Sequence, residues 1–180
     1  MIIWNTQIIM VILIIILSES FAQSTEWTLQ NGKASRQKKI SIPNKTANEI
    51  YKDISRWLVK YYRDPEENLK ARVDGEYIRG VGYHSGFVAP GALAAADLQY
   101  GFMFEVGDQE VIFKITDVVL LYYPTQDTDD GVYRIEDYLK PTSKRKNRKS
   151  QSDEIVASLT QFSNSLFQSF ESYVLANDNK

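Results

Sequence analysis

Two amphipathic helical patterns enclose a run of strand-like segments, and this arrangement most constrains the fold. The first pattern repeats apolar residues at spacings of three and four: Ile50, Ile54, Trp57, Leu58 and Tyr61. The second does the same near the C-terminus: Ile155, Leu159, Phe162, Leu166, Phe170 and Tyr173. Each set traces one apolar stripe, which is typical of a helix that packs on a single neighbour. We therefore expect both helices on one face of a sheet, with the other face open to solvent.

Local signals set the helix ends. Thr46 and Glu49 form the spacing of a capping box, in which each side chain bonds to the other residue's backbone amide. Pro65 disfavours a helical residue before it and so ends the first helix. Ser152 is the predicted cap of the last helix. Trp57 is the predicted anchor of the first helix, deeply buried in the core.

Strand patterns occupy most of the chain between the helices. Alternating apolar and polar residues predict these strands: 37–42, 69–73, 77–87, 98–106 and 111–122, with a lead-in strand at 27–29. Asp74-Gly75 is a hairpin signal. Residues 132–139 fit either a short strand or a helical turn. The order is strand, helix, four strands, helix, which predicts an α+β domain with a mainly antiparallel sheet and two helices on one face.

The first 22 residues have the pattern of a signal peptide. Ile8 to Leu17 is an uninterrupted apolar run, and Ser20-x-Ala22 matches a small-residue cleavage site before Gln23. This segment contains no Lys or Arg, so an uncleaved membrane anchor is the alternative. The apolar run is shorter than the roughly 20 residues that span a bilayer. We expect cleavage between Ala22 and Gln23, and a soluble periplasmic or secreted product.

The remaining sequence, 23–180, has the size of a single domain, with its core at about 36–175. Removing Glu19 from the 23 acidic residues leaves 22 against 21 basic ones, a net charge of −1. This balance argues against a general binder of nucleic acid. The absence of cysteine excludes disulfides, thiolate metal sites and thiol nucleophiles.

Several short segments resemble a family of bacterial exported domains of unknown function with a TATA-binding-protein-like fold. They are Ile40-Ser41-Ile42-Pro43, Glu49-Ile50-Tyr51, Trp57-Leu58, Gly80-Val81-Gly82, Phe113-Lys114-Ile115-Thr116-Asp117 and Ile135-Glu136-Asp137-Tyr138. The resemblance covers roughly residues 25–175 and implies a strand-helix-four-strand-helix fold. It implies no activity, and the name of the fold does not imply DNA binding.

Strand 77–87 carries a candidate binding surface. Its odd positions are bulky and its even positions nearly bare, so the bulky side is expected under the helices. The open side would then present a smooth patch bordered by a histidine and a methionine: Gly80, Gly82, His84, Gly86, Gly101 and Met103. Strand glycines mark close approach by another backbone or a ligand. The simpler interpretation, which we favour, is that they permit strong twist or a bulge.

The ionisable residues yield no catalytic or metal site. His84 is the single histidine and lacks a nucleophile or further ligands, so an exposed strand histidine is the simpler interpretation. Asp117 would share the buried face of its strand unless a bulge or the sheet rim displaces it, and we favour that displacement. Residues 127–131 are rich in aspartate and end in glycine, like a calcium-binding loop, but they lack the ligand spacing of one. We expect no cofactor and no metal.

The basic residues at 140–150 read as a loop. Without interleaved aromatic residues it does not fit a single-strand nucleic-acid binder. A solvated linker is the default interpretation, and the functional alternative is contact with an anionic envelope surface.

We expect an exported, non-enzymatic binding or envelope-associated module that recognises a protein or peptide. One alternative is a hydrolase that uses Asp97, Glu105 or Asp117, provided that they meet in a cleft. Another is an inhibitor of an exported enzyme, with protruding loops at 88–96 or 124–131.

Overall fold

A computed structural model describes residues 26–87, 96–122, 131–140 and 146–176, and side chains except those of 146–151. Its strands are β1 (Thr28–Gln30), β2 (Lys33–Ser41), β3 (Leu69–Val73), β4 (Tyr77–Phe87), β5 (Ala96–Gly107), β6 (Glu110–Tyr122) and β7 (Gly131–Arg134). Its helices are α2 (Ala47–Tyr61), α3 (Pro65–Asn68), α4 (Ile135–Leu139) and α5 (Lys146–Ala176). The expected signal peptide and its cleavage site at Ala22 and Gln23 lie outside these residues.

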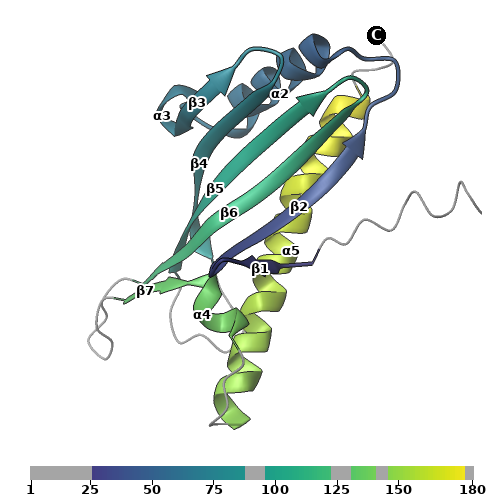
Figure 1. Cartoon of the computed structure of the whole chain (residues 1–180). Coiled ribbons are helices and arrows are strands. Elements are labelled where there is room, and N and C mark those ends of the chain that lie inside the picture. The colour runs from purple at the N-terminus through teal and green to yellow at the C-terminus, as the bar shows by residue number, and fades with distance from the viewer. Residues whose placement is uncertain (1–25, 88–95, 123–130, 141–145, 177–180) are drawn as a thin grey trace, which may run out of the picture.

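All seven strands join one antiparallel sheet in the order β1-β2-β6-β5-β4-β3, with β7 paired to the far end of β6. In Figure 1, α2 and α5 lie behind this sheet, on the same side. The predicted α+β architecture, with a mainly antiparallel sheet and both long helices on one face, is therefore confirmed. None of the helices in the described part of the chain is long and apolar enough to cross a membrane.

Helix α2 begins at the predicted capping box and ends at Tyr61, before Pro65, which is the first residue of α3. The Thr46 side chain accepts a bond from the Glu49 amide, and the Glu49 carboxylate accepts one from the Thr46 amide at 2.8 Å. Trp57 is 2% exposed, with its ring 5.9 Å from Phe104 and 5.4 Å from Phe170. It thus joins α2 to both β5 and α5, which confirms its role as the anchor.

Helix α5 begins earlier than predicted. It starts at Lys146, so residues 146–150 are helical rather than part of a loop, and Ser152 lies inside the helix instead of capping it. Residues 141–145 lie outside the described residues. The stripe is also rotated slightly: Phe167 and Val174 are fully buried, while Phe162 and Tyr173 lie at its half-buried margins.

Residues 132–139 contain both of the elements between which the sequence left a choice. Strand β7 ends at Arg134 and α4 follows at once. The change from strand to helix at this point buries Ile135, which is 1% exposed. The Glu136 carboxylate accepts a 2.8 Å hydrogen bond from the backbone amide of Ala34. A helical turn at this point directs Glu136 onto β2.

Strand β6 contains a bulge, which is one of the two ways that its sequence offered for displacing Asp117 from the core. Gly101 pairs with Thr116 and Gln99 pairs with Val119, so two residues of β6 oppose one of β5. Asp117 takes a left-handed conformation with φ 48°. The bulge moves burial from the odd positions before it to Val118 and Leu120 after it, and it places Asp117 outside the core.

Candidate functional site

The six residues of the predicted glycine patch do not lie on one surface. The prediction was wrong mainly about which side of β4 faces the helices. Gly80 and Gly82 face the helices, where they lie opposite Phe102 and Tyr100 of β5. A Cβ on Gly82 would come within 2.3 Å of the Tyr100 ring, and one on Gly80 would come as close to the Phe102 ring. These glycines leave room for the two core rings of the neighbouring strand, so the nearly bare side of β4 faces the core.

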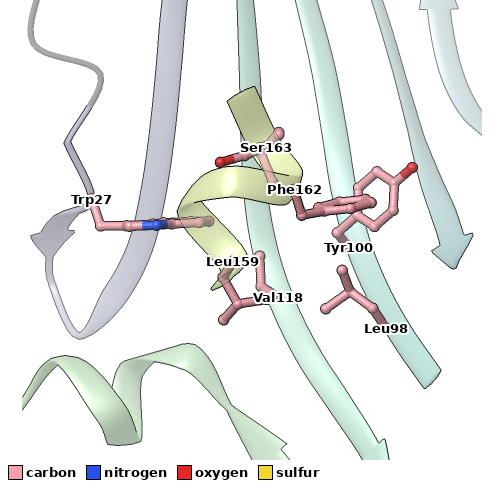
Figure 2. Close-up of a pocket in the computed structure, with 8 residues that line it drawn as sticks. Trp27, Leu98, Tyr100, Val118, Leu159, Phe162 and Ser163 are labelled. Atoms are coloured by element: carbon pink, nitrogen blue, oxygen red, sulfur yellow. The ribbon is translucent and has the colours of Figure 1, made fainter. Parts of the chain in front are cut away.

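His84 also lies on the helix side, paired with Leu98 of β5. Its ring is 5.1 Å from Phe162 of α5, and its side chain is exposed. Figure 2 shows the adjoining apolar seam, with Phe162 beside Tyr100 and with Trp27 on the other side of the α5 turn. The seam leaves no room for a water-sized molecule, so it is packed core rather than a ligand site.

The three other predicted patch residues lie apart from Gly80 and Gly82. Gly86 has φ 71° at a register shift in β4 and donates its amide to Asp97 at 3.2 Å. Gly101 faces away from the helices, where its missing side chain leaves space for Thr116 beside the β6 bulge. Gly86 thus lies at an irregularity of its own strand and Gly101 lies opposite one, as the simpler interpretation held. Met103 shares the face of Gly101.

The face opposite the helices is the surface that remains accessible. We call it the uncovered face and define it by Arg79, Val81, Gly101, Met103, Ile112 and Lys114. No described helix packs on this side, and the apolar members Val81, Met103 and Ile112 are half-buried. The face therefore combines an apolar strip with charged margins.

Two cations of this face flank Met103. Arg79 pairs with Met103 from β4 and Lys114 pairs with it from β6, which places their backbones about 10 Å apart, two strand spacings. Among the described residues, neither side chain forms a hydrogen bond or ion pair, whereas nearby Lys39 is joined to Glu110 at 2.5 Å. Arg79 and Lys114 are thus two cations of the uncovered face without an ion pair to a described carboxylate, and Glu105, two residues after Met103 on β5, is the acidic residue nearest to them along that strand.

The carboxylates considered for hydrolysis do not meet. Asp97 and Glu105 lie eight positions apart on β5, about 26 Å along the strand. Asp117 lies between them near Gly101, where Thr116 donates to its carboxylate at 3.0 Å. The cleft that the hydrolase alternative requires is therefore not formed by these three residues. The described residues also contain no group of three histidine or acidic side chains that could hold a metal ion.

A groove runs between the two long helices. Its walls are Trp57, Lys60 and Tyr61 of α2 and Ser169, Ser172, Tyr173 and Ala176 of α5, and its volume is about 520 Å³. The residues recur at spacings of three and four on both helices, so each helix presents one side to the groove. We call this cavity the α2–α5 groove; no pattern in the sequence predicted it. Tyr61 lines the groove and is exposed, whereas the apolar stripe had predicted that it lies in the core.

Two buried polar sites, Arg36 and the Tyr62–Tyr100 pair, were also missed, and both are structural. Arg36 is 2% exposed and donates to the Thr160 carbonyl at 2.9 Å and to Asn164 at 2.7 Å. The hydroxyls of Tyr62 and Tyr100 share a 2.9 Å hydrogen bond, and burial raises the pKa of both phenols far above the ordinary value. Both phenols therefore stay neutral at physiological pH and act as a core hydrogen bond rather than as acid or base.

The calcium-like loop at 127–130 and the predicted protruding loops at 88–95 and 124–130 lie outside the described residues. Gly131 and Ala96, which closed these segments in the sequence, are the first residues of β7 and β5. The side chains of the basic segment are described only for Lys140, which is joined to Asp137 at 3.2 Å.

Comparison with solved structures finds the same fold in two bacterial proteins. A TBP-like protein from Parabacteroides distasonis is 17% identical with a TM-score of 0.58, covering 80% of this chain and 96% of that one. A DUF4468 family protein from Bacteroides ovatus is 14% identical with a TM-score of 0.65, covering 82% of this chain and 90% of that one. No protein-family model matches the chain, and no curated protein matches its sequence. The likeness confirms the expected TBP-like α+β fold and indicates no activity.

Proposed function

We propose that the chain is an exported, non-catalytic module that binds an acidic, partly apolar segment of a partner protein on its uncovered face. The observation that carries this proposal is the Arg79–Met103–Lys114 row, in which two cations flank an apolar side chain on a face that no described helix covers. Carboxylates of the partner would lie over the cations, while apolar side chains would lie over Val81 and Ile112. Complementary charge of this kind sets partner choice and association rate.

The non-catalytic part of the proposal is supported by the geometry of the ionisable groups. Asp97, Glu105 and Asp117 are spread along the sheet, and His84 faces Phe162 rather than a carboxylate. The export part is supported by the apolar run and small-residue site before Gln23. Mass spectrometry of the protein outside the cytoplasm tests export: a chain beginning at Gln23 is expected, and one retaining Met1 would contradict it.

A pull-down from cell-envelope extract tests the binding surface. The double variant Arg79→Glu/Lys114→Glu is expected to weaken capture of a stoichiometric partner at least about tenfold, because it reverses both charges under the partner's carboxylates. The matched control is Lys52→Glu/Arg63→Glu, which reverses two exposed cations on the helix side of the molecule.

High salt is also expected to reduce capture by the unchanged protein, since exposed charge pairs are screened. Equal capture by both double variants, or capture that high salt leaves unchanged, would contradict the uncovered face as the site. Circular dichroism on each variant confirms that the fold is retained.

A further inference from the structure

The α2–α5 groove has the construction of a small-molecule site rather than of a packing defect. Its volume of about 520 Å³ lies within the range of ligand pockets. Trp57 forms its base, with the indole nitrogen donating to Ser169 across the groove at 3.4 Å. Tyr61 lies against Trp57 with ring centroids 4.7 Å apart and an interplanar angle of 24°, and it remains 39% exposed. The groove thus offers a flat aromatic surface to a ligand.

The charge of the groove lining favours an anionic ligand. Lys60 is the single charged residue among those that line the groove. Its ammonium lies 5.5 Å from the centre of the Tyr173 ring, so the cation is held over the groove between the two helices. Ser169 and Ser172 add hydroxyl groups, and the described lining contains no carboxylate. An anionic group on the ligand would therefore meet attraction from Lys60 without repulsion from a carboxylate among the described wall residues.

We propose that this groove binds a small carboxylate that carries a flat, apolar ring system. The ring stacks on Tyr61 and the carboxylate pairs with Lys60, while the serine hydroxyls donate to the remaining oxygen positions. The groove and the uncovered face lie on opposite sides of the sheet, so this site is independent of the proposed protein partner.

Fluorine NMR with a matched pair of probes tests the proposal on the purified chain. The probes are 5-fluoroindole-3-acetate and its neutral amide, which share a ring and differ in the charged group. The acetate is expected to bind, and the amide is expected to bind about fivefold more weakly, as the loss of one partly exposed charge pair implies. Equal binding of the two probes, or no binding of either, would overturn the proposal.

Three variants locate the site. Lys60→Gln is expected to bring the acetate down to the affinity of the amide, whereas the control Lys52→Gln, also exposed on α2, leaves both unchanged. Ser172→Trp places a large ring in the groove from an exposed position and should abolish binding without lowering the melting temperature. Retained binding in Ser172→Trp would overturn the assignment. If the unchanged chain binds neither probe and Ser172→Trp loses capture of the protein partner, the groove is a protein-docking site and the proposal is overturned as well.

Discussion

The two faces of the sheet are built from the same strands but differ in what packs on them. On the helix side, β5 and β6 present rings that pack against α2 and α5, and Phe104 and Phe113 stack with centroids 4.1 Å apart. On the uncovered face the same strands present Met103 and Lys114, half-buried and facing solvent. The difference shows that alternation along each strand separates a buried core face from a half-buried one, which is the face that we propose binds a partner. Substitutions on one face should therefore change folding, and those on the other should change binding.

The largest effect is expected from Trp57→Ala. Trp57 contacts rings from α2, β5, β6 and α5, so its removal should lower the free energy of unfolding by about 3–5 kcal/mol. Met103→Ala on the uncovered face should lower it by about 1 kcal/mol, because Met103 is half-buried. Urea denaturation followed by circular dichroism measures both. Similar losses in the two variants would show that the uncovered face is part of the core.

A smaller effect separates the glycines of the two faces. Gly82→Ala forces a methyl group against the Tyr100 ring, whose hydroxyl is held by Tyr62, and should lower the free energy of unfolding by about 2–3 kcal/mol. Gly101→Ala meets the Thr116 hydroxyl at 2.8 Å and the Thr116 carbonyl at 3.3 Å. The hydroxyl can move by giving up its 3.0 Å bond to Asp117, so about 1 kcal/mol is expected. Thermal unfolding of the two variants side by side checks the order. The reverse order would contradict the packing of β4 against β5.

The smallest effect concerns the β6 bulge. Asp117 has φ 48°, a conformation that strains residues with side chains, so Asp117→Gly should be neutral or raise the free energy of unfolding by up to about 1 kcal/mol. Asp117→Val should lower it by about 1–2 kcal/mol, since a branched side chain is strained further there. Chemical denaturation of both variants is the measurement. A stabilising valine would mean that the strand is regular at this point.

Local signals in the sequence predicted much of the fold because they act over a few residues. The Thr46–Glu49 capping box, the apolar stripe through Trp57 and the bulge at Asp117 each depend on near neighbours in the chain. The structure reproduces the capping box and the bulge, and it buries the stripe except at Tyr61. The start of α5 was missed because residues 146–150 carry no apolar periodicity, although the helix extends through them.

The orientation of β4 required information that its own sequence does not contain. Bulk alone placed Tyr83 inside and Gly82 outside, whereas Tyr83 is 61% exposed and Gly82 is buried. The deciding factor is the partner strand: Tyr100 and Phe102 of β5 fill the space above the glycines. Only the pairing register of β4 with β5 reveals this, so the candidate surface was assigned to the wrong face. The α2–α5 groove was missed for a related reason, because it depends on how two distant helices meet.

The bond network of Arg36 has a consequence for the order of assembly. Arg36 lies on β2, near the beginning of the fold, while its acceptors Thr160 and Asn164 belong to the last helix. Strand β2 also depends on β6 for its ladder, so the first long strand cannot reach its final state until almost the whole chain has been synthesised. Such distant pairing slows folding, and ribosome-bound fragments that end before residue 160 should leave this guanidinium hydrated and β2 sensitive to proteases.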